Sequence, residues 1–134
     1  MKVLLDTHIL LWTLTANDKL SDRAREIIAS KDNDIFYSTA SVWEVSIKHS
    51  IHPEYMPLSG RELSEYCLEA GYEVLSVKDE HVYVLETLVR KEDAPRHNDP
   101  FDRIMIAQAK AEGMLFLTRD SLLSYYNEKC ILLV

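Results

Sequence analysis

The sequence predicts an α/β fold, a three-layer α/β/α sandwich around a mostly parallel central sheet. Short apolar runs rich in strand-forming residues alternate with segments whose apolar residues recur at helical spacing. Hydrophobic residues make up 47% of the 134-residue chain. This content suffices for one core, and we expect a single domain over residues 1–134. No apolar run approaches the roughly 20 residues that a membrane-spanning helix needs, so no membrane protein is expected.

In the first half of the chain, the apolar run 2–6 ends on an acid and indicates a buried parallel strand. A short helix is expected to follow, and Ser21 is placed to begin a second helix. The run 34–38 indicates the second strand, and Ser38 or Thr39 should cap the helix after it. Together these signals give strands at 2–6 and 34–38, and helices at 7–12, 21–29 and 39–51.

In the second half, Ser59 is expected to cap a helix that Gly71 ends. Asp99 is a good N-cap residue, Pro100 suits the first helical position, and Gly113 suits the end of that helix. The last apolar run should form an edge strand. The expected strands are 72–75, 114–117 and 130–134, and the expected helices are 62–70, 78–88, 100–113 and a short one near 122–125.

The formal net charge of −7 argues against a protein that binds nucleic acid through a broad basic surface. It does not exclude a nucleic-acid enzyme whose carboxylates are covered by bound cations. The two cysteines, Cys67 and Cys130, show neither metal-ligand nor paired-motif spacing. A reducing, cytoplasmic location is the simplest expectation.

Four acids are expected at one edge of the sheet. Asp6 and Asp120 follow the carboxyl ends of apolar strands, where open parallel sheets bind ligands. Asp102 lies in the first turn of a helix, and Glu44 lies on the helix that leaves the second strand. Each has an ordinary alternative: Asp102 can serve helix capping, and Glu44 can form an exposed pair with Lys48.

Carboxylates that crowd together must raise their pKa values or recruit a cation. An all-oxygen cluster favours Mg²⁺ or Mn²⁺, and such ions activate water for phosphodiester hydrolysis. The residue types therefore point to a metal-dependent phosphodiesterase.

Four sequence blocks resemble the motifs of PIN-domain ribonucleases, and among these the VapC-type toxins of bacterial toxin-antitoxin pairs. They occur in the family's order at 4–8, 41–48, 99–109 and 117–120. The resemblance implies a PIN-like fold and a Mg²⁺- or Mn²⁺-dependent endoribonuclease that a cognate antitoxin inhibits. By motif position, the catalytic and metal-binding acids would be Asp6, Glu44, Asp102 and Asp120.

The resemblance also implies supporting residues and partners. Thr7 and Thr118 would orient ligands or bound water, and Asp99 would act as a helix cap or support the ligands. A homodimer, or a hetero-oligomer with the antitoxin, is implied in the same way. The chain departs from the family at 49–53, where related sequences often have a Gly-Lys turn; this affects loop contacts and leaves the acids in place.

Several roles stay open. Lys48, Arg103 and Arg119 would contact RNA phosphates or balance neighbouring acids. His97 would touch substrate or be solvated. Trp12 and Trp43 would line a groove for an antitoxin helix or belong to the core.

Two other classes of function compete with the nuclease. One is a catalytically silent protein-binding module of the same fold. The other is an aspartyl phosphatase or phosphate receiver, since Asp6 ends the first strand. Position 8 is histidine, so the Asp-x-Asp of haloacid-type phosphatases is absent.

Overall fold

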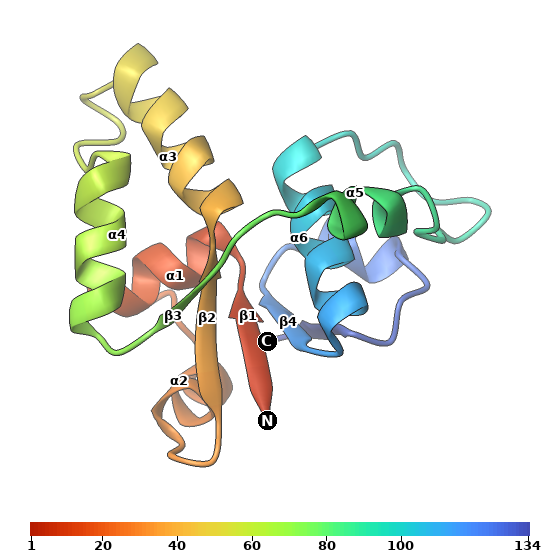
Figure 1. Ribbon diagram of the computed structural model, residues 1–134, viewed down its shortest axis with the longest axis horizontal. Coiled ribbons are helices and arrows are strands. Elements are labelled where there is room, and N and C mark those ends of the chain that lie inside the picture. The colour runs from red at the N-terminus through yellow and green to blue at the C-terminus, as the bar shows by residue number, and fades with distance from the viewer.

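A five-stranded, fully parallel sheet forms the centre of the molecule (Figure 1). The computed structural model describes residues 1–134. The spatial order is β3-β2-β1-β4-β5. The strands are β1 (Lys2–Leu5), β2 (Asp34–Ser38), β3 (Glu73–Leu75), β4 (Leu115–Thr118) and β5 (Ile131–Leu133). The expected α/β/α sandwich with a parallel sheet is confirmed.

Six α-helices and one 3₁₀ helix connect the strands. Their bounds are α1 (Thr7–Leu14), α2 (Asp22–Ala29), α3 (Thr39–Ile51), α4 (Gly60–Glu69), α5 (Asp79–Leu85), α6 (Pro100–Glu112) and the 3₁₀ helix η1 (Ser121–Tyr125). Every expected helix is present, although the one predicted at 78–88 ends at Leu85. None of them is both long enough and apolar enough to span a bilayer.

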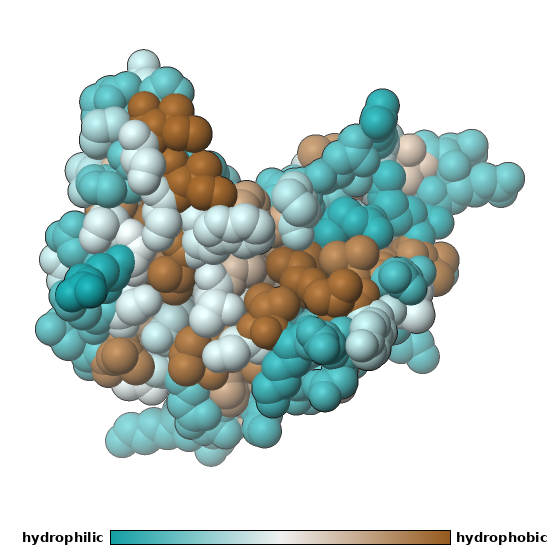
Figure 2. Space-filling view, turned by 45° about the horizontal axis from the view of Figure 1, so that its top comes forward, coloured by the Kyte–Doolittle hydropathy of each residue, from teal (hydrophilic) through white to brown (hydrophobic).

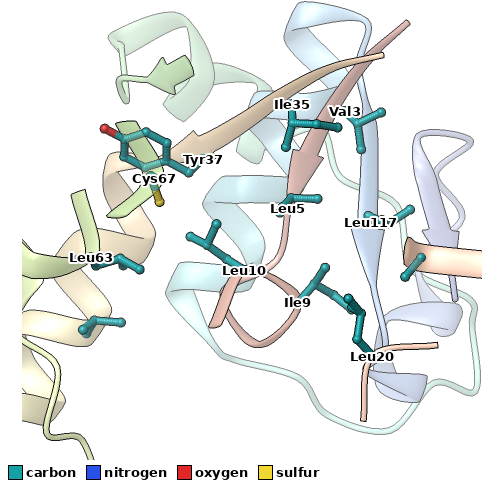
Figure 3. Close-up of a cluster of buried hydrophobic side chains, with 12 residues drawn as sticks. Val3, Leu5, Ile9, Leu10, Leu20, Ile35, Tyr37, Leu63, Cys67 and Leu117 are labelled. Atoms are coloured by element: carbon teal, nitrogen blue, oxygen red, sulfur yellow. The ribbon is translucent and has the colours of Figure 1, made fainter. Parts of the chain in front are cut away.

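Alternating strand residues supply two hydrophobic layers, one on each face of the sheet. Val3 and Leu5 pack with residues of α1, α2, α3 and α4 (Figure 3). Leu4 points to the opposite face and packs with Met105 and Ile106 of α6. Because side chains alternate along a strand, a single run of apolar residues can serve both layers.

The connections place a topological switch point between β1 and β4. After β1 the chain moves through β2 and β3 to one edge of the sheet, and then returns to β4 and β5 on the other side. In open parallel sheets, the crevice at such a point lies outside the carboxyl ends of the strands and is the usual ligand site.

The apolar stripe of α3 lies outside the core. Trp43 is 63% exposed and Ile51 is 64% exposed, and Ile47 is also exposed. The interpretation of Trp43 as a core residue is therefore wrong. The face of α3 that is buried instead carries Ala40, Ser41, Glu44 and Val45. Helical spacing puts these three apolar residues on one side of the helix, but it does not show which side meets the sheet.

Candidate active site

Asp6 lies at the carboxyl end of β1, where it directly follows the strand and caps α1. Its Oδ1 accepts a hydrogen bond from the Thr7 backbone N–H at 2.7 Å. Its Oδ2 accepts from the Thr118 hydroxyl at 2.6 Å. Burial raises the pKa of Asp6, and these two hydrogen bonds partly oppose that increase. The carboxylate at the end of β1 is thus held in a defined orientation by β4.

Thr118 also joins Asp120 to this arrangement. The Asp120 backbone N–H donates to the Thr118 hydroxyl at 3.1 Å, and Asp120 Oδ1 caps η1 by accepting from the Leu122 N–H at 2.9 Å. A surface hollow of about 270 Å³ lies here, lined by Asp6, His8, Trp12, Arg119 and Asp120. Two of the four predicted acids therefore share one hollow at the switch point of the sheet.

Asp102 approaches from α6, as the capping signals predicted. Asp99 Oδ1 accepts from the backbone N–H groups of Phe101 at 2.9 Å and Asp102 at 3.3 Å, and Pro100 is the first helical residue. This places the Asp102 side chain inward, where it is largely buried. Burial raises its pKa to about 8, and the negative charges of Asp6, Asp99, Glu44 and Asp120 add to the effect.

Glu44 is the fourth acid, and it reaches the site from the buried side of α3. Its Oε2 is 2.8 Å from the Lys48 ammonium. Its Oε1 is buried and has no hydrogen-bond partner. The Glu44–Lys48 pair exists, but Glu44 is only 7% exposed, so the interpretation as a freely exposed pair is wrong. A buried carboxylate oxygen without a partner is costly unless a cation or water engages it.

His97 is the residue that sequence reasoning did not place. It is 7% exposed, and its Nδ1 lies 2.9 Å from the Tyr126 hydroxyl. Its Nε2 lies 3.2 Å from Asp102 Oδ2. Burial lowers its pKa. The expectation of a solvated loop histidine is wrong, because the segment before α6 pairs with residues after β4 through a bridge between Arg90 and Tyr126. No local sequence pattern predicts this long-range contact.

The tightest grouping of ligand atoms differs from the predicted acid set. Single donor atoms of His97, Asp102 and Asp120 lie within 4.8 Å of one another. Asp6 and Glu44 lie close enough to this group for their charges to raise the pKa of Asp102. The structure therefore brings all four predicted acids into one electrostatic neighbourhood and adds a histidine to it.

The other predicted residues have protein partners. The Thr7 hydroxyl pairs with the Ser41 hydroxyl at 2.8 Å, so only its backbone N–H contacts Asp6. Arg103 Nη1 donates to the Tyr126 hydroxyl at 3.0 Å, and Arg119 donates to the Lys19 carbonyl. Arg119 nevertheless lines the hollow beside Asp6 and Asp120.

The donor set fits a hard divalent cation. It consists mainly of carboxylate oxygens from four separate segments, which is the chemistry that Mg²⁺ and Mn²⁺ prefer. The unpartnered Glu44 Oε1 and the raised pKa of Asp102 both indicate negative charge that the protein alone does not compensate. The residues present can therefore hold such an ion.

An open cleft gives access to this edge of the sheet. Figure 2 shows the surface hollowed between the projecting end of α3 and the part of the molecule that carries α5 and α6. Trp43 of α3 and Phe101 of α6 meet edge to face, with ring centroids 5.0 Å apart. Trp43 directly precedes Glu44 and Phe101 directly precedes Asp102, so α3 and α6 meet next to two of the acids in the sequence.

Comparison with known proteins assigns the chain to a family. The family model described as the PIN domain matches residues 3–129. The chain belongs to the PIN domain family. This PIN domain is also similar in fold to a crystal structure described as VapBC2 from Rickettsia felis bound to a DNA fragment from their promoter. That likeness has a TM-score of 0.69 and 16% identity, and covers 100% of this chain and 98% of that chain. A search among curated proteins found no significant match.

Proposed function

We propose that this PIN domain is a Mg²⁺- or Mn²⁺-dependent endoribonuclease that acts as the toxin of a toxin-antitoxin pair. The observation that carries the proposal is the meeting of Asp6, Glu44, Asp102 and Asp120 at the switch point of a parallel sheet. These four residues would hold the cation and form the catalytic site. Membership of the PIN family and the fold shared with a VapBC complex support the same activity.

A divalent ion in this site supplies Lewis-acid stabilisation of the phosphate and activation of water. The protein's part is to hold the carboxylates in place. The Thr118 hydroxyl fixes Asp6 Oδ2, and the capped first turn of α6 presents Asp102. In the metal-free protein, a pKa of about 8 keeps a proton on Asp102 near neutral pH, and this carboxyl must release the proton to act as a ligand.

Substrate binding would rest on a few cations, because the chain is acidic overall. Arg119 lines the hollow next to two of the acids and is the best-placed candidate for phosphate contact. Lys48 and Arg103 would contribute charge at the same edge. All three cations already have a protein partner, and Arg119 is distinguished by lining the hollow. The cleft between the projecting end of α3 and the part of the molecule that carries α5 and α6 is the proposed path for a single RNA strand.

The decisive experiment is cleavage of a labelled single-stranded RNA by the purified chain with Mg²⁺, Mn²⁺ or EDTA. We expect metal-dependent cutting that Asp6→Asn abolishes without unfolding the protein. The matched control is Asp34→Asn, which removes the same charge from the exposed start of β2, at the opposite end of the strands. Full activity of the Asp6 variant would contradict the assignment of the site. A folded chain that neither cuts RNA nor binds Mn²⁺ would favour a silent binding module.

The proposed antitoxin would cover apolar surface that the chain leaves open. Trp43, Ile47 and Ile51 form an exposed stripe along α3, and brown, hydrophobic side chains gather on its projecting end in Figure 2. A groove of about 610 Å³ nearby is lined by residues of α1, α4 and the loop before α4, among them Leu11, Met56 and Leu58. In the free state we expect a homodimer, and with the antitoxin a hetero-oligomer.

We predict that Ile51→Asp weakens binding of the cognate antitoxin at least about tenfold, since a charge in a buried apolar contact costs several times RT. The matched control is Val82→Asp on α5, a comparably exposed apolar residue away from α3. Calorimetric titration of each variant with the antitoxin measures the effect. Equal affinity of both variants and the native chain would remove the α3 stripe from the proposed interface.

A further inference from the structure

A buried chain of hydrogen bonds runs from a guanidinium to one of the site carboxylates. Arg103 Nη1 is 3.0 Å from the Tyr126 hydroxyl. That hydroxyl is 2.9 Å from His97 Nδ1, and His97 Nε2 is 3.2 Å from Asp102 Oδ2. Tyr126 and His97 are both buried. Arg103 and Asp102 are neighbours on α6, whereas the two residues between them come from other segments.

Arg103 fixes the direction of the first hydrogen bond in this chain. A guanidinium has only donors, so Arg103 donates to the Tyr126 oxygen. The Tyr126 hydroxyl keeps one hydrogen of its own, which it can donate to Nδ1 of His97. With that hydrogen bond in place, neutral His97 carries its proton on Nε2. When Asp102 releases its own proton to bind a cation, its Oδ2 becomes an acceptor for this Nε2 proton at the observed 3.2 Å.

We propose that His97 is a positioning residue for the metal centre, in which the Arg103–Tyr126–His97 chain fixes the orientation of the Asp102 carboxylate. The N–H of Nε2 would hold Oδ2, and Oδ1, which has no hydrogen bond in the structure, would be presented to the cation. The inference rests on the proposed metal-dependent function. It assigns to His97 and Tyr126 a role that their place in the sequence does not suggest.

Support through Asp102 fits the geometry better than direct ligation by His97. Both ring nitrogens already have partners, one on each side of the ring. Hard cations also prefer the carboxylate oxygens that surround them here. A hydrogen-bonded partner behind a ligand typically improves metal affinity by 10- to 100-fold.

The packing around Tyr126 makes the chain rigid. The rings of Tyr126 and His97 are perpendicular, with centroids 5.5 Å apart. The guanidinium groups of Arg90 and Arg103 lie 5.2 Å and 5.9 Å from the centre of the Tyr126 ring. Arg90 also donates to the Pro95 carbonyl in the segment that leads to His97. A tyrosine ring restrained by these contacts can hold the imidazole of His97, and hence the Asp102 carboxylate, in one orientation.

The test uses two amide variants that place a donor at different ends of the histidine ring. Glutamine puts its side-chain N–H near the position of Nε2, whereas asparagine puts it near Nδ1. We expect His97→Asn to weaken Mn²⁺ binding about 10- to 100-fold in calorimetric titration, and His97→Gln to restore affinity to within about threefold. Tyr126→Phe keeps the ring and removes the hydroxyl, and we expect it to weaken Mn²⁺ binding by a smaller factor.

A second measurement separates positioning from general packing. In an Asp102→Asn background the carboxylate that His97 holds is absent, so His97→Asn should cause no further loss of Mn²⁺ affinity. Circular dichroism and thermal melting of each variant report whether it is folded. Tyr126→Phe keeps the core shape and tests the chain if the His97 variants do not fold.

Three outcomes overturn the proposal. Native Mn²⁺ affinity in a folded His97→Asn variant would show that the imidazole does not position the Asp102 carboxylate for the metal. An equal loss in His97→Gln and His97→Asn would indicate that His97 is itself a ligand. If the native chain binds no Mn²⁺ and cuts no RNA, the proposed function fails as well. Mn²⁺ binding by the native chain combined with an unaffected His97→Asn variant rejects this inference alone.

Discussion

Asp102 is the residue whose proposed function conflicts most with folding, because burial disfavours the charged form that a metal ligand needs. Its pKa rises from 3.8 to about 8 because burial and the surrounding acids disfavour the charged form. Between those two values the folded state binds a proton that the unfolded state has released. The free energy of unfolding of the metal-free protein therefore falls as pH rises from about 4 to about 8, by about 1.4 kcal/mol for each pKa unit that is realised.

We predict that Asp102→Asn stabilises the metal-free protein, and that the gain is larger at pH 8 than at pH 5. Asparagine keeps the shape of the side chain and removes the charge that the fold tolerates poorly. Thermal melting in EDTA at the two pH values measures the difference. Asp34→Asn at the exposed start of β2 is the control for removing one negative charge away from the site. A destabilised Asp102→Asn at pH 8 would contradict the raised pKa.

Sequence reasoning at this scale placed the acids and two supporting residues, Thr118 and Asp99, but it did not place His97. Asp6 and Asp120 could be placed because a strand end fixes where the next side chain lies. His97 could not be placed, because its burial depends on Tyr126, which is 29 residues further along the chain. Glu44 gave a mixed outcome: its pair with Lys48 is a local feature of one helix, whereas its burial depends on tertiary packing.

At the scale of elements, α6 is the part of the site that the sequence predicted most completely. Its start at Pro100 and its end before Gly113 follow from local capping chemistry. Gly113 has a φ of 66°, a left-handed conformation that suits glycine at a helix end. By contrast, α3 has its apolar stripe on the exposed side. Spacing alone does not say whether such a stripe meets the core or a partner.

The capping role of Asp99 gives a prediction for this helix. Asp99→Ala removes the acceptor for two backbone N–H groups, so we expect a loss of about 1 kcal/mol in the free energy of unfolding. Asp99→Asn keeps a good capping oxygen and should unfold at nearly the native urea concentration. Because the Asn variant removes only the charge, a large loss of Mn²⁺ affinity in it would assign Asp99 to the metal centre beyond its role as a cap.

At the scale of the whole molecule, the site depends on the order of the strands. β1 and β4 are neighbours in the sheet although more than 100 residues separate them. Sequence motifs predicted that the acids would meet, but the pairing of β1 with β4 is what allows Thr118 to hold Asp6. The carboxylates come from widely separated segments, so a bound cation would connect parts of the chain that come apart on unfolding.

This connection predicts that Mn²⁺ raises the melting temperature. An ion that binds only the folded state adds about 2.7 kcal/mol when its concentration is 100 times Kd. For a chain of this size that corresponds to a rise of roughly 10 °C. Asp6→Asn should reduce the shift strongly, whereas Asp34→Asn, at the amino end of the strands, should keep it. An equal shift in both variants would place the ion elsewhere on this acidic surface, because the same charge is removed in each and only the position differs.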